Sequence, residues 1–148
     1  MTFEFNRYHV PVNKSESIVV SLPGPGLHEC TSRVSDVVAS AGVSSGLCTV
    51  FIRHTSASLI IQENADPSAR ADMEAWLNRL VPEADPLYTH VDEGPDDMPA
   101  HIKSLLTCVS ISIPILDGRL ALGTWQGLYL WEHRRGRSSR ELVITLSG

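Results

Sequence analysis

The sequence predicts an α+β fold, an antiparallel β-sheet or sandwich covered by two to three helices. Three observations support this prediction: apolar residues alternate along several short segments, amphipathic helical patterns lie between those segments, and an Asp-Gly pair marks a hairpin in the C-terminal part. The 148 residues are enough to bury a core and few enough for one unit, so we expect a single domain over residues 1–148.

The first forty residues are predicted to form two strands and a helix. Extended segments are expected over residues 2–12 and 16–22, and the Pro-Gly-Pro-Gly run that follows breaks the second of them. A helix is expected over residues 31–40, because small apolar side chains recur there at the i, i+3, i+4, i+7 spacing. Gly42 supplies a stop signal for this helix.

Two apolar strands are predicted next, over residues 47–54 and 58–64, as partners in one sheet. Both are apolar in the middle and polar at one end, where the first carries His54 and the second carries Glu63. A sheet with this pattern delivers its polar groups to the rim, so these two side chains are candidates for a site.

The Asp66-Pro67 pair predicts the start of a helix, since Asp is a good N-cap and Pro is suited to the first helical position. Pro82 ends the helix, and Arg70 and Glu74 are placed to pair across one turn of its outer face. The predicted buried stripe consists of Ala69, Met73, Trp76, Leu77 and Leu80.

A polar, proline-bearing loop is predicted over residues 84–99, a length that is uncommon without a functional reason. A short helix over residues 100–106 follows, with His101 in its first turn. The remainder is predicted to be all-β, with a turn at Asp117-Gly118 and strands over residues 109–116, 119–133 and 141–146.

Composition and charge exclude several classes of protein. The formal net charge of -5 argues against a general nucleic-acid binder, and no apolar run approaches the roughly 20 residues of a membrane span. The N-terminus lacks the layout of a signal peptide, which favours the cytoplasm. Three widely spaced cysteines do not form a disulfide framework, and Cys48 and Cys108 are expected to be small buried hydrophobes.

Three histidines stand out as candidates for chemistry: His54, His90 and His101. Each alone is compatible with a histidine in an incidental structural role. Together they match a metal site that leaves a coordination position open, with Glu63 or Asp92 as a supporting carboxylate. Their spacing is not a recognised zinc signature, so proton transfer without a metal remains an alternative.

Two C-terminal features are candidates for substrate contacts. Glycines bracket Trp125 and Gln126, as expected where a ligand or another backbone comes close, whereas the alternating Tyr129 and Trp131 are expected in the core. Four arginines crowd a probable turn after residue 133, where they either face solvent or clamp a phosphate, and Arg140 begins the last strand.

Four blocks of this sequence, around His54, Glu63, His101 and Trp125, together resemble the YjbQ family, also called the secondary thiamine-phosphate synthase family. The resemblance covers essentially the whole chain and extends to Glu132-His133-Arg134 and to the closing Thr145-Leu146-x-Gly148. The main blocks are His54-Thr55-Ser56-Ala57-Ser58-Leu59, Glu63-Asn64 with Asp66-Pro67, Asp97-Met98-Pro99-Ala100-His101-Ile102-Lys103 and Gly123-Thr124-Trp125-Gln126-Gly127.

The resemblance implies a compact α+β domain that assembles as a homotrimer, with polar pockets near the subunit boundaries. It implies a thiamine-phosphate synthase activity, which joins a pyrimidine pyrophosphate to a thiazole phosphate and releases pyrophosphate. It also implies that the active-site set consists of His54, Glu63, His90, Asp92 and His101.

We therefore expect an enzyme that binds a phosphorylated small molecule and a divalent metal. Zinc or another transition metal suits the histidines, and magnesium is possible because pyrophosphate chemistry usually recruits it. Two other functions stay open, a non-catalytic trimeric binder of a phosphorylated metabolite or metal, and a metal-dependent hydrolase. The expected catalytic residues are His54, Glu63, Asp92 and His101; the expected metal ligands are His54, His90 and His101; the expected pocket residues are Thr55, Asn64, Trp125, Gln126 and Arg140.

Overall fold

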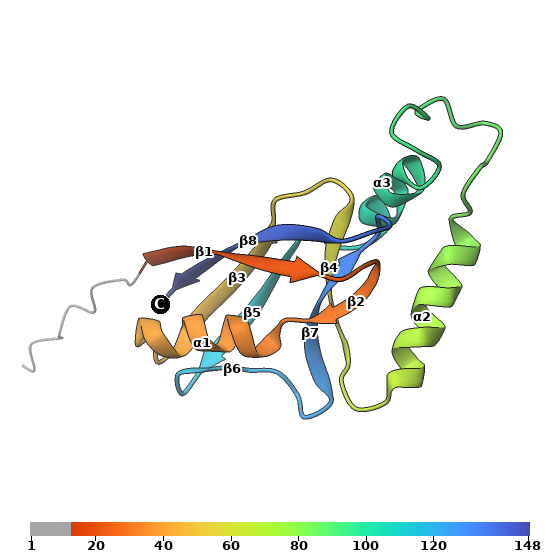
Figure 1. Cartoon of the computed structure of the whole chain (residues 1–148). Coiled ribbons are helices and arrows are strands. Elements are labelled where there is room, and N and C mark those ends of the chain that lie inside the picture. The colour runs from red at the N-terminus through yellow and green to blue at the C-terminus, as the bar shows by residue number, and fades with distance from the viewer. Residues whose placement is uncertain (1–12) are drawn as a thin grey trace, which may run out of the picture.

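The computed structural model describes residues 13–148, so the strand predicted over residues 2–12 lies outside the described residues. Within residues 13–148, eight strands and three helices follow one another (Figure 1). Their bounds are β1 (Asn13–Leu22), β2 (Gly26–Glu29), α1 (Thr31–Ala41), β3 (Gly46–Ile52), β4 (Ala57–Glu63), α2 (Pro67–Leu80), α3 (Asp97–Leu106), β5 (Ser110–Leu116), β6 (Arg119–Leu120), β7 (Gln126–Glu132) and β8 (Ser138–Ser147).

The strands form two antiparallel sheets, which together with the helices confirm the predicted α+β class. The larger sheet has the order β1-β8-β3-β5-β6 and the smaller one has the order β2-β7-β4. The last strand, β8, lies between β1 and β3 and pairs with both. A single bridge between Leu59 and Cys108 connects the backbone of β4 to the chain just before β5.

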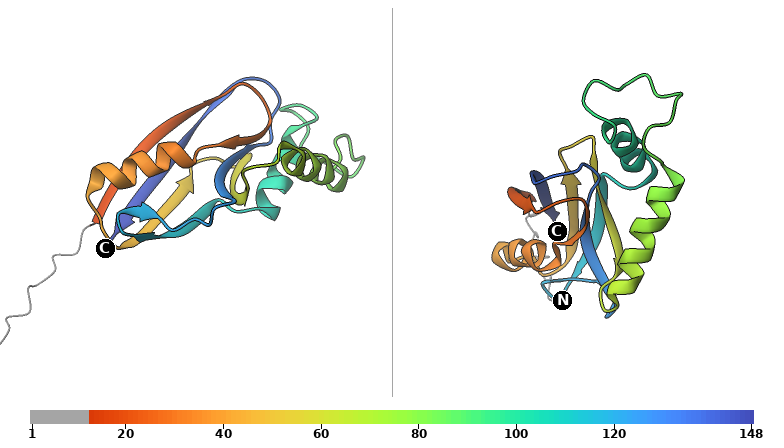
Figure 2. Two further views of the ribbon diagram at one scale, coloured as in Figure 1. Left: turned by 90° about the horizontal axis from the view of Figure 1, so that it is seen from below. Right: turned by 45° about the vertical axis from the view of Figure 1, so that its right-hand side comes forward.

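The main core lies between the sheets and under α1. In β3 the predicted alternation is observed, since Cys48, Val50 and Ile52 are buried while Phe51 is exposed. Leu128 and Leu130 of β7 enter this core from the smaller sheet. Helix α1 adds its apolar stripe from one side, and Figure 2 shows α1 and α2 on different sides of the strand layers.

A second, smaller core lies between α2 and the other face of β7. Trp131 packs there with Leu77 and Val81, and Tyr129 is fully buried, so the predicted aromatic stripe is confirmed. The predicted burial of Trp76 and Leu80 is wrong, because the three-stranded sheet is narrow and α2 contacts it only along a thin stripe. These last two side chains are 57% and 52% exposed.

The predicted pairing of Arg70 with Glu74 on the outside of α2 is also not found among the described residues. Glu74 instead accepts a hydrogen bond from the backbone N–H of Leu27 at 2.7 Å, which ties α2 to β2. Arg70 lies over the ring of Tyr129, 5.7 Å from its centroid. Both side chains therefore serve contacts between elements, which spacing along one helix does not reveal.

Two predictions of strand pairing and continuity are wrong, and one strand was missed. The long strand expected over residues 119–133 is two strands, because the chain leaves the larger sheet after β6 and enters the smaller one at β7. β3 and β4 are not partners, since β3 pairs with β5 and β8 while β4 pairs with β7. β2 was not predicted, because the Pro-Gly-Pro-Gly run was interpreted only as a break. A short strand begins at the last residue of this run and pairs with β7.

Most other boundaries agree with the predictions within a few residues, and α3 begins at Asp97 rather than at residue 100. Asp117 and Gly118 both have positive φ, which confirms the predicted tight turn. Cys48 is buried as expected, whereas Cys108 is exposed. Within residues 13–148 no helix is both long and apolar enough to cross a membrane.

Substitution of Leu130 by Ala is expected to lower the free energy of unfolding by about 2–5 kcal/mol, because this side chain is fully buried in the main core. The measurement is denaturant unfolding followed by circular dichroism. The matched control is Leu87→Ala, since Leu87 is 84% exposed and should change stability by no more than about 0.5 kcal/mol. Equal losses in the two variants would contradict this account of the core.

Candidate metal centre and adjoining pocket

Two histidines and one carboxylate meet at the first turn of α3. Asp97 opens the helix and His101 lies one turn later on the same face, while His90 comes from the preceding loop. Asp97 Oδ2 lies 2.7 Å from His90 Nε2 and 3.3 Å from His101 Nε2. The three ligating atoms all lie within 4.8 Å of one another, so a single cation can reach all of them.

The hydrogen bonding of His101 shows why a cation suits this cluster. His101 Nδ1 lies 3.0 Å from the carbonyl oxygen of Thr55, which can only accept, so Nδ1 carries the proton. In the neutral ring Nε2 is then an acceptor, and it faces another acceptor, Asp97 Oδ2. This arrangement is stable only when a proton or a cation lies between the two atoms. A ring held by a backbone carbonyl with its other nitrogen free is typical of metal-binding histidines.

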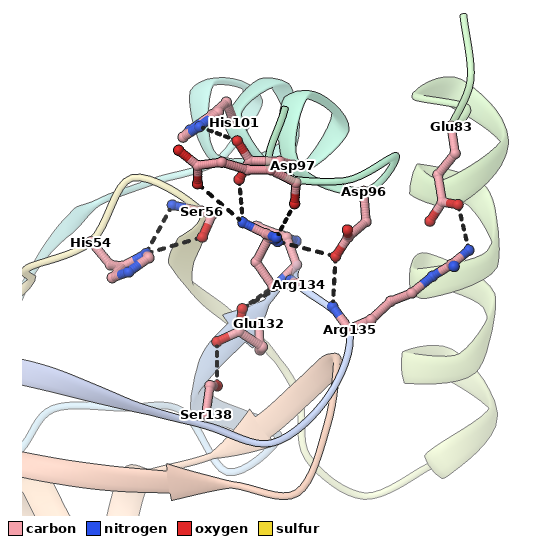
Figure 3. A network of polar contacts seen from close by, with 12 residues as sticks. His54, Ser56, Glu83, Asp96, Asp97, His101, Glu132, Arg134, Arg135 and Ser138 are labelled. Atoms are coloured by element: carbon pink, nitrogen blue, oxygen red, sulfur yellow. Dashed lines mark hydrogen bonds and ion pairs between the residues drawn. The ribbon is translucent and has the colours of Figure 1, made fainter. Parts of the chain in front are cut away.

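An arginine from the connection between β7 and β8 fixes Asp97 from the other side (Figure 3). Arg134 pairs with Asp97 Oδ1 and donates from Nε to Asp96 Oδ2 at 3.1 Å. It also donates to the backbone oxygen of Glu93 at 2.9 Å, so it holds the end of the loop before α3. Burial raises the pKa of Asp96, but hydrogen bonds from the Arg135 backbone and the Arg134 side chain lower it more, and the net direction is downward.

Beneath Arg134 lies a buried carboxylate, Glu132, whose side chain is fully enclosed. Glu132 Oε1 accepts from the backbone N–H of Arg134 at 2.9 Å, and Oε2 accepts from Ser138 Oγ at 2.8 Å. Arg140 completes the ion pair: its Nη2 donates to Oε1 at 3.0 Å, and its Nε lies 2.7 Å from Oε2 without forming a hydrogen bond. Of the arginines predicted to face solvent or clamp phosphate, Arg134 and Arg140 are therefore committed to carboxylates of this chain.

His54 lies near this cluster but is not part of it. Its Nδ1 accepts from the backbone N–H of Ser56 at 3.1 Å, which leaves the proton of the neutral ring on Nε2. Burial, followed by the charge of Arg140, lowers the pKa of His54, so the ring is neutral at physiological pH. A ring in this state donates a hydrogen bond through Nε2 and is a poor metal ligand at that nitrogen.

An open, largely apolar pocket of about 560 Å³ lies between β3 and α3, with His54 and His101 in its lining. Thr55 lies between them, and its carbonyl holds His101. The apolar part is formed by Phe51, Leu105 and Val109, which are exposed in the single chain. The pocket therefore combines a polar end next to the candidate metal ligands with an apolar surface that suits a flat organic ring.

Four other predicted site residues, Glu63, Asn64, Trp125 and Gln126, lie at the far end of the smaller sheet. β4 and β7 run antiparallel, with Ala57 opposite Glu132 at one end and Glu63 opposite Gln126 at the other. Six residue steps separate these ends, so Glu63 lies roughly 20 Å from the His54 end. Asn64 donates to the carbonyls of Thr124 and Gln126, and thus holds the turn that carries Trp125.

Asp92 is exposed, and no hydrogen bond or ion pair of its side chain is found within residues 13–148. Asp97, which the sequence analysis did not select, takes the place beside the histidines. The sequence feature that could have identified Asp97 is its spacing of four residues from His101. That spacing places two side chains on one face only if both residues are helical.

A second buried histidine, His133, follows β7 and faces away from the candidate metal centre. Its Nε2 lies 2.8 Å from Ser58 Oγ, and both residues are buried. Burial, assisted by the positive charge of Lys103, lowers the pKa of His133 to about 3. The ring is therefore neutral in the folded protein across the physiological range.

Comparisons with known proteins identify the relatives of this chain. A family model described as "UPF0047 protein YjbQ-like" matches residues 16–148. A UPF0047 protein of Synechocystis sp. is 54% identical over 133 residues, which are 90% of this chain and 90% of that protein. The UPF0047 protein YjbQ of Salmonella typhimurium is 44% identical over 133 residues, which are 89% of this chain and 96% of that protein.

Solved structures agree with these sequence matches. An uncharacterized conserved protein of the YjbQ/UPF0047 family from Clostridium acetobutylicum is 36% identical, with a TM-score of 0.78 over 90% of this chain and 98% of that one. A YbjQ-like protein of unknown function from Sulfolobus solfataricus has a TM-score of 0.84 over 94% of this chain and 99% of that one. At 22% identity, the second likeness shows the fold alone.

The lowered pKa of His133 predicts a pH dependence of stability. Below pH 6.5 the unfolded chain takes up a proton at this ring, whereas the folded chain does not until about pH 3. The free energy of unfolding should therefore fall with falling pH over this window, with a contribution that approaches about 1.4 kcal/mol per pH unit. Urea unfolding between pH 7 and pH 4 measures the slope, with His133→Gln as the comparison. Parallel slopes for the two proteins would show that His133 is not held neutral by the fold.

Proposed function

This chain belongs to the UPF0047 YjbQ-like family, and we propose that it is a cytoplasmic metal-dependent enzyme acting on a phosphorylated small molecule. The reaction that we propose is thiamine-phosphate synthase-like, the joining of a pyrimidine pyrophosphate to a thiazole phosphate with release of pyrophosphate. The observation that carries the proposal is the opposed pair of acceptors, His101 Nε2 and Asp97 Oδ2, at 3.3 Å with His90 beside them.

The donor set fits a transition metal. Two imidazole nitrogens and one carboxylate oxygen are ligands that zinc and similar ions accept, and three protein ligands leave a position for water or substrate. Magnesium is the weaker fit, because it prefers oxygen ligands and keeps several waters. We propose His90, Asp97 and His101 as the metal ligands. His54 is proposed to contact the substrate instead of the metal.

A bound divalent ion would neutralise the charge of a departing pyrophosphate. The chain's own residues prepare the surroundings. The Thr55 carbonyl fixes the tautomer of His101, and Arg134 holds the other oxygen of Asp97, so the carboxylate keeps one oxygen for the metal. His54 offers Nε2–H to a phosphoryl oxygen, because Ser56 already occupies Nδ1. This donor needs no change of protonation at physiological pH.

The apolar pocket beside these groups supports a substrate with a flat ring. The surface formed by Phe51, Leu105 and Val109 would receive a heterocycle, while its phosphate lies toward His54 and the metal ligands. The reaction assay separates the alternatives. Pyrophosphate release that requires both substrates supports the synthase, release without the thiazole phosphate supports a hydrolase, and binding without turnover supports a non-catalytic binder.

We also propose that the protein works as a homotrimer. The apolar surface of the pocket is open in the single chain, with Leu105 81% exposed, and a neighbouring subunit would close the pocket around the bound ring. Assembly would also give a route by which Glu63, Asn64 and Trp125, at the far end of the smaller sheet, reach a site in another subunit. A site shared in this way would bring the His54 end of the smaller sheet in one subunit together with the Glu63 end in another subunit.

Replacement of Asp97 by Asn is expected to lower zinc content to well under one ion per subunit and to abolish turnover, because the ligand loses its charge. Metal content by mass spectrometry of protein purified without a tag, and the pyrophosphate-release assay, measure the two effects. Asp92→Asn is the matched control, since that exposed carboxylate lies outside the cluster and should leave the metal bound. Full metal content in Asp97→Asn would reject this ligand set.

The trimer is tested by Leu105→Glu, which is expected to shift the assembly toward monomer because a charge would be buried at the covered surface. Light scattering coupled to size exclusion gives the mass. Leu87→Glu, at an equally exposed leucine away from the pocket, should leave the mass unchanged. A wild-type mass of one chain would remove the trimer from the proposal.

A further inference from the structure

A cleft without a role in the proposed reaction lies on a different side of α3 from the candidate metal centre. It consists of two adjoining hollows of about 100 Å³ and about 490 Å³, between α2, α3, the start of β2 and the end of β7. Four residues line both hollows, so these form one continuous depression: Pro25, Asn78, Lys103 and His133. Among the described residues, none lines both this cleft and the apolar pocket beside the metal centre. The cleft is therefore a separate place on the molecule, with room for a small organic ligand.

One group in this cleft is a buried imidazole with a free nitrogen. His133 is only 6% exposed, and its Nε2 lies 2.8 Å from the hydroxyl oxygen of Ser58. Ser58 is fully buried, and within residues 13–148 its hydroxyl has no other hydrogen-bond partner, so the O–H donates to Nε2. The neutral ring then carries its proton on Nδ1. This atom has no partner within the same residues, yet it is not sealed from solvent, so its N–H opens into the cleft that His133 lines.

A second neutral donor lies in the same lining. Asn78 is on α2, and its Oδ1 accepts a hydrogen bond from Nζ of Lys103 at 2.7 Å. A lysine amine can donate such a bond with or without its extra proton, so this orientation of the amide does not depend on the charge of Lys103. The NH2 group of the amide has no partner in the described part of the chain. Asn78 thus presents this group to the two hollows that it lines.

The smaller hollow also offers an acceptor. Glu74 of α2 lines it, and Oε1 of this carboxylate accepts from the backbone N–H of Leu27 at 2.7 Å. Its Oε2 has no hydrogen bond or ion pair within residues 13–148 and is accessible. The other carboxylates of the lining, Glu83 and Glu132, are paired with arginines. The groups left for recognition are therefore two neutral donors and one acceptor.

The walls between these polar groups are largely apolar. Pro25 lines both hollows, Trp131 lines the smaller one, and Val81 and Pro82 line the larger one. Apolar walls with a few convergent polar groups are typical of sites for small organic ligands. The flat surfaces of proline and indole favour a ring over a flexible chain.

We propose that this cleft binds a small uncharged ring compound that carries an amide or urea group, that is, a carbonyl oxygen next to an N–H. The carbonyl oxygen accepts from Nδ1–H of His133 and from the NH2 group of Asn78. The adjacent N–H donates to Oε2 of Glu74, and the ring contacts the apolar walls. The binding is non-covalent, and it uses none of the residues of the proposed active site.

Uracil is the probe for this site, because its ring is small, uncharged at pH 7, and carries carbonyl groups next to N–H groups. It is titrated into isotope-labelled protein without added metal, and nuclear magnetic resonance follows the side-chain amide of Asn78 and the ring nitrogens of His133. We expect saturable shifts of both groups. Uracil methylated at both ring nitrogens keeps the carbonyls but lacks the N–H groups, so it should bind more weakly. Toluene, a ring without either group, should not shift the two signals.

A matched pair of variants tests the contact with Asn78. Asn78→Asp removes the NH2 group at nearly constant size and should weaken uracil binding about fivefold or more. Asn13→Asp, at an exposed asparagine of β1 outside the cleft, makes the same change in charge and should keep the wild-type affinity. Circular dichroism checks that both variants fold. Should Asn78→Asp not fold, the comparison of uracil with its methylated form in the wild type decides.

Three outcomes would overturn the proposal: no response of Asn78 and His133 to uracil up to its solubility, an equal response to toluene, or equal affinity of the two folded variants for uracil. Neither metal content nor turnover enters these measurements. A failed metal site would therefore leave the expected uracil binding unchanged, and absence of uracil binding would leave the metal ligands in place.

Discussion

The ion pair between Asp97 and Arg134 is the interaction on which the polar half of this protein depends. Asp97 has a side chain that is only 2% exposed, and a buried carboxylate without a paired charge is costly. Arg134 supplies the paired charge, and it also donates hydrogen bonds to the Asp96 carboxylate and to the backbone oxygen of Glu93. One guanidinium thus joins α3 to the chain between the two sheets, and the geometry of His90 and His101 follows from it.

Arg134 and Arg140 pair with carboxylates of this chain, so neither is free to clamp an anion. Glu132 neutralises Arg140 from below and orders the backbone of Arg134, so the positive charges near the site are already balanced. Asp97 Oδ2 and His101 Nε2 face each other at 3.3 Å, so a proton or a cation has to lie between them. The metal site proposed above would place a divalent ion at this position, held by His90, Asp97 and His101.

The sequence predicted the class of the fold and many of the single elements, because alternation, capping and turn signals are local. Pairing was harder: β3 and β4 look like neighbours in sequence but belong to different sheets, and nothing local marks the change of sheet between β6 and β7. In the candidate metal cluster, the sequence analysis had selected His90 and His101 but not Asp97, whose place beside them depends on where α3 begins. The engagement of Arg134 with Asp96 and Asp97 depends on long-range contacts, which no spacing along the chain encodes.

The place of β8 in the larger sheet has a consequence for how the protein is made. β8 is synthesised after all the other described strands, yet it lies between β1 and β3 and pairs with both. Until it emerges from the ribosome, the nascent chain carries two strands whose edges have no partner on that side. Such non-local pairing slows folding and leaves apolar edges open to other chains. The larger sheet of this protein therefore cannot be completed before the C-terminal strand is available.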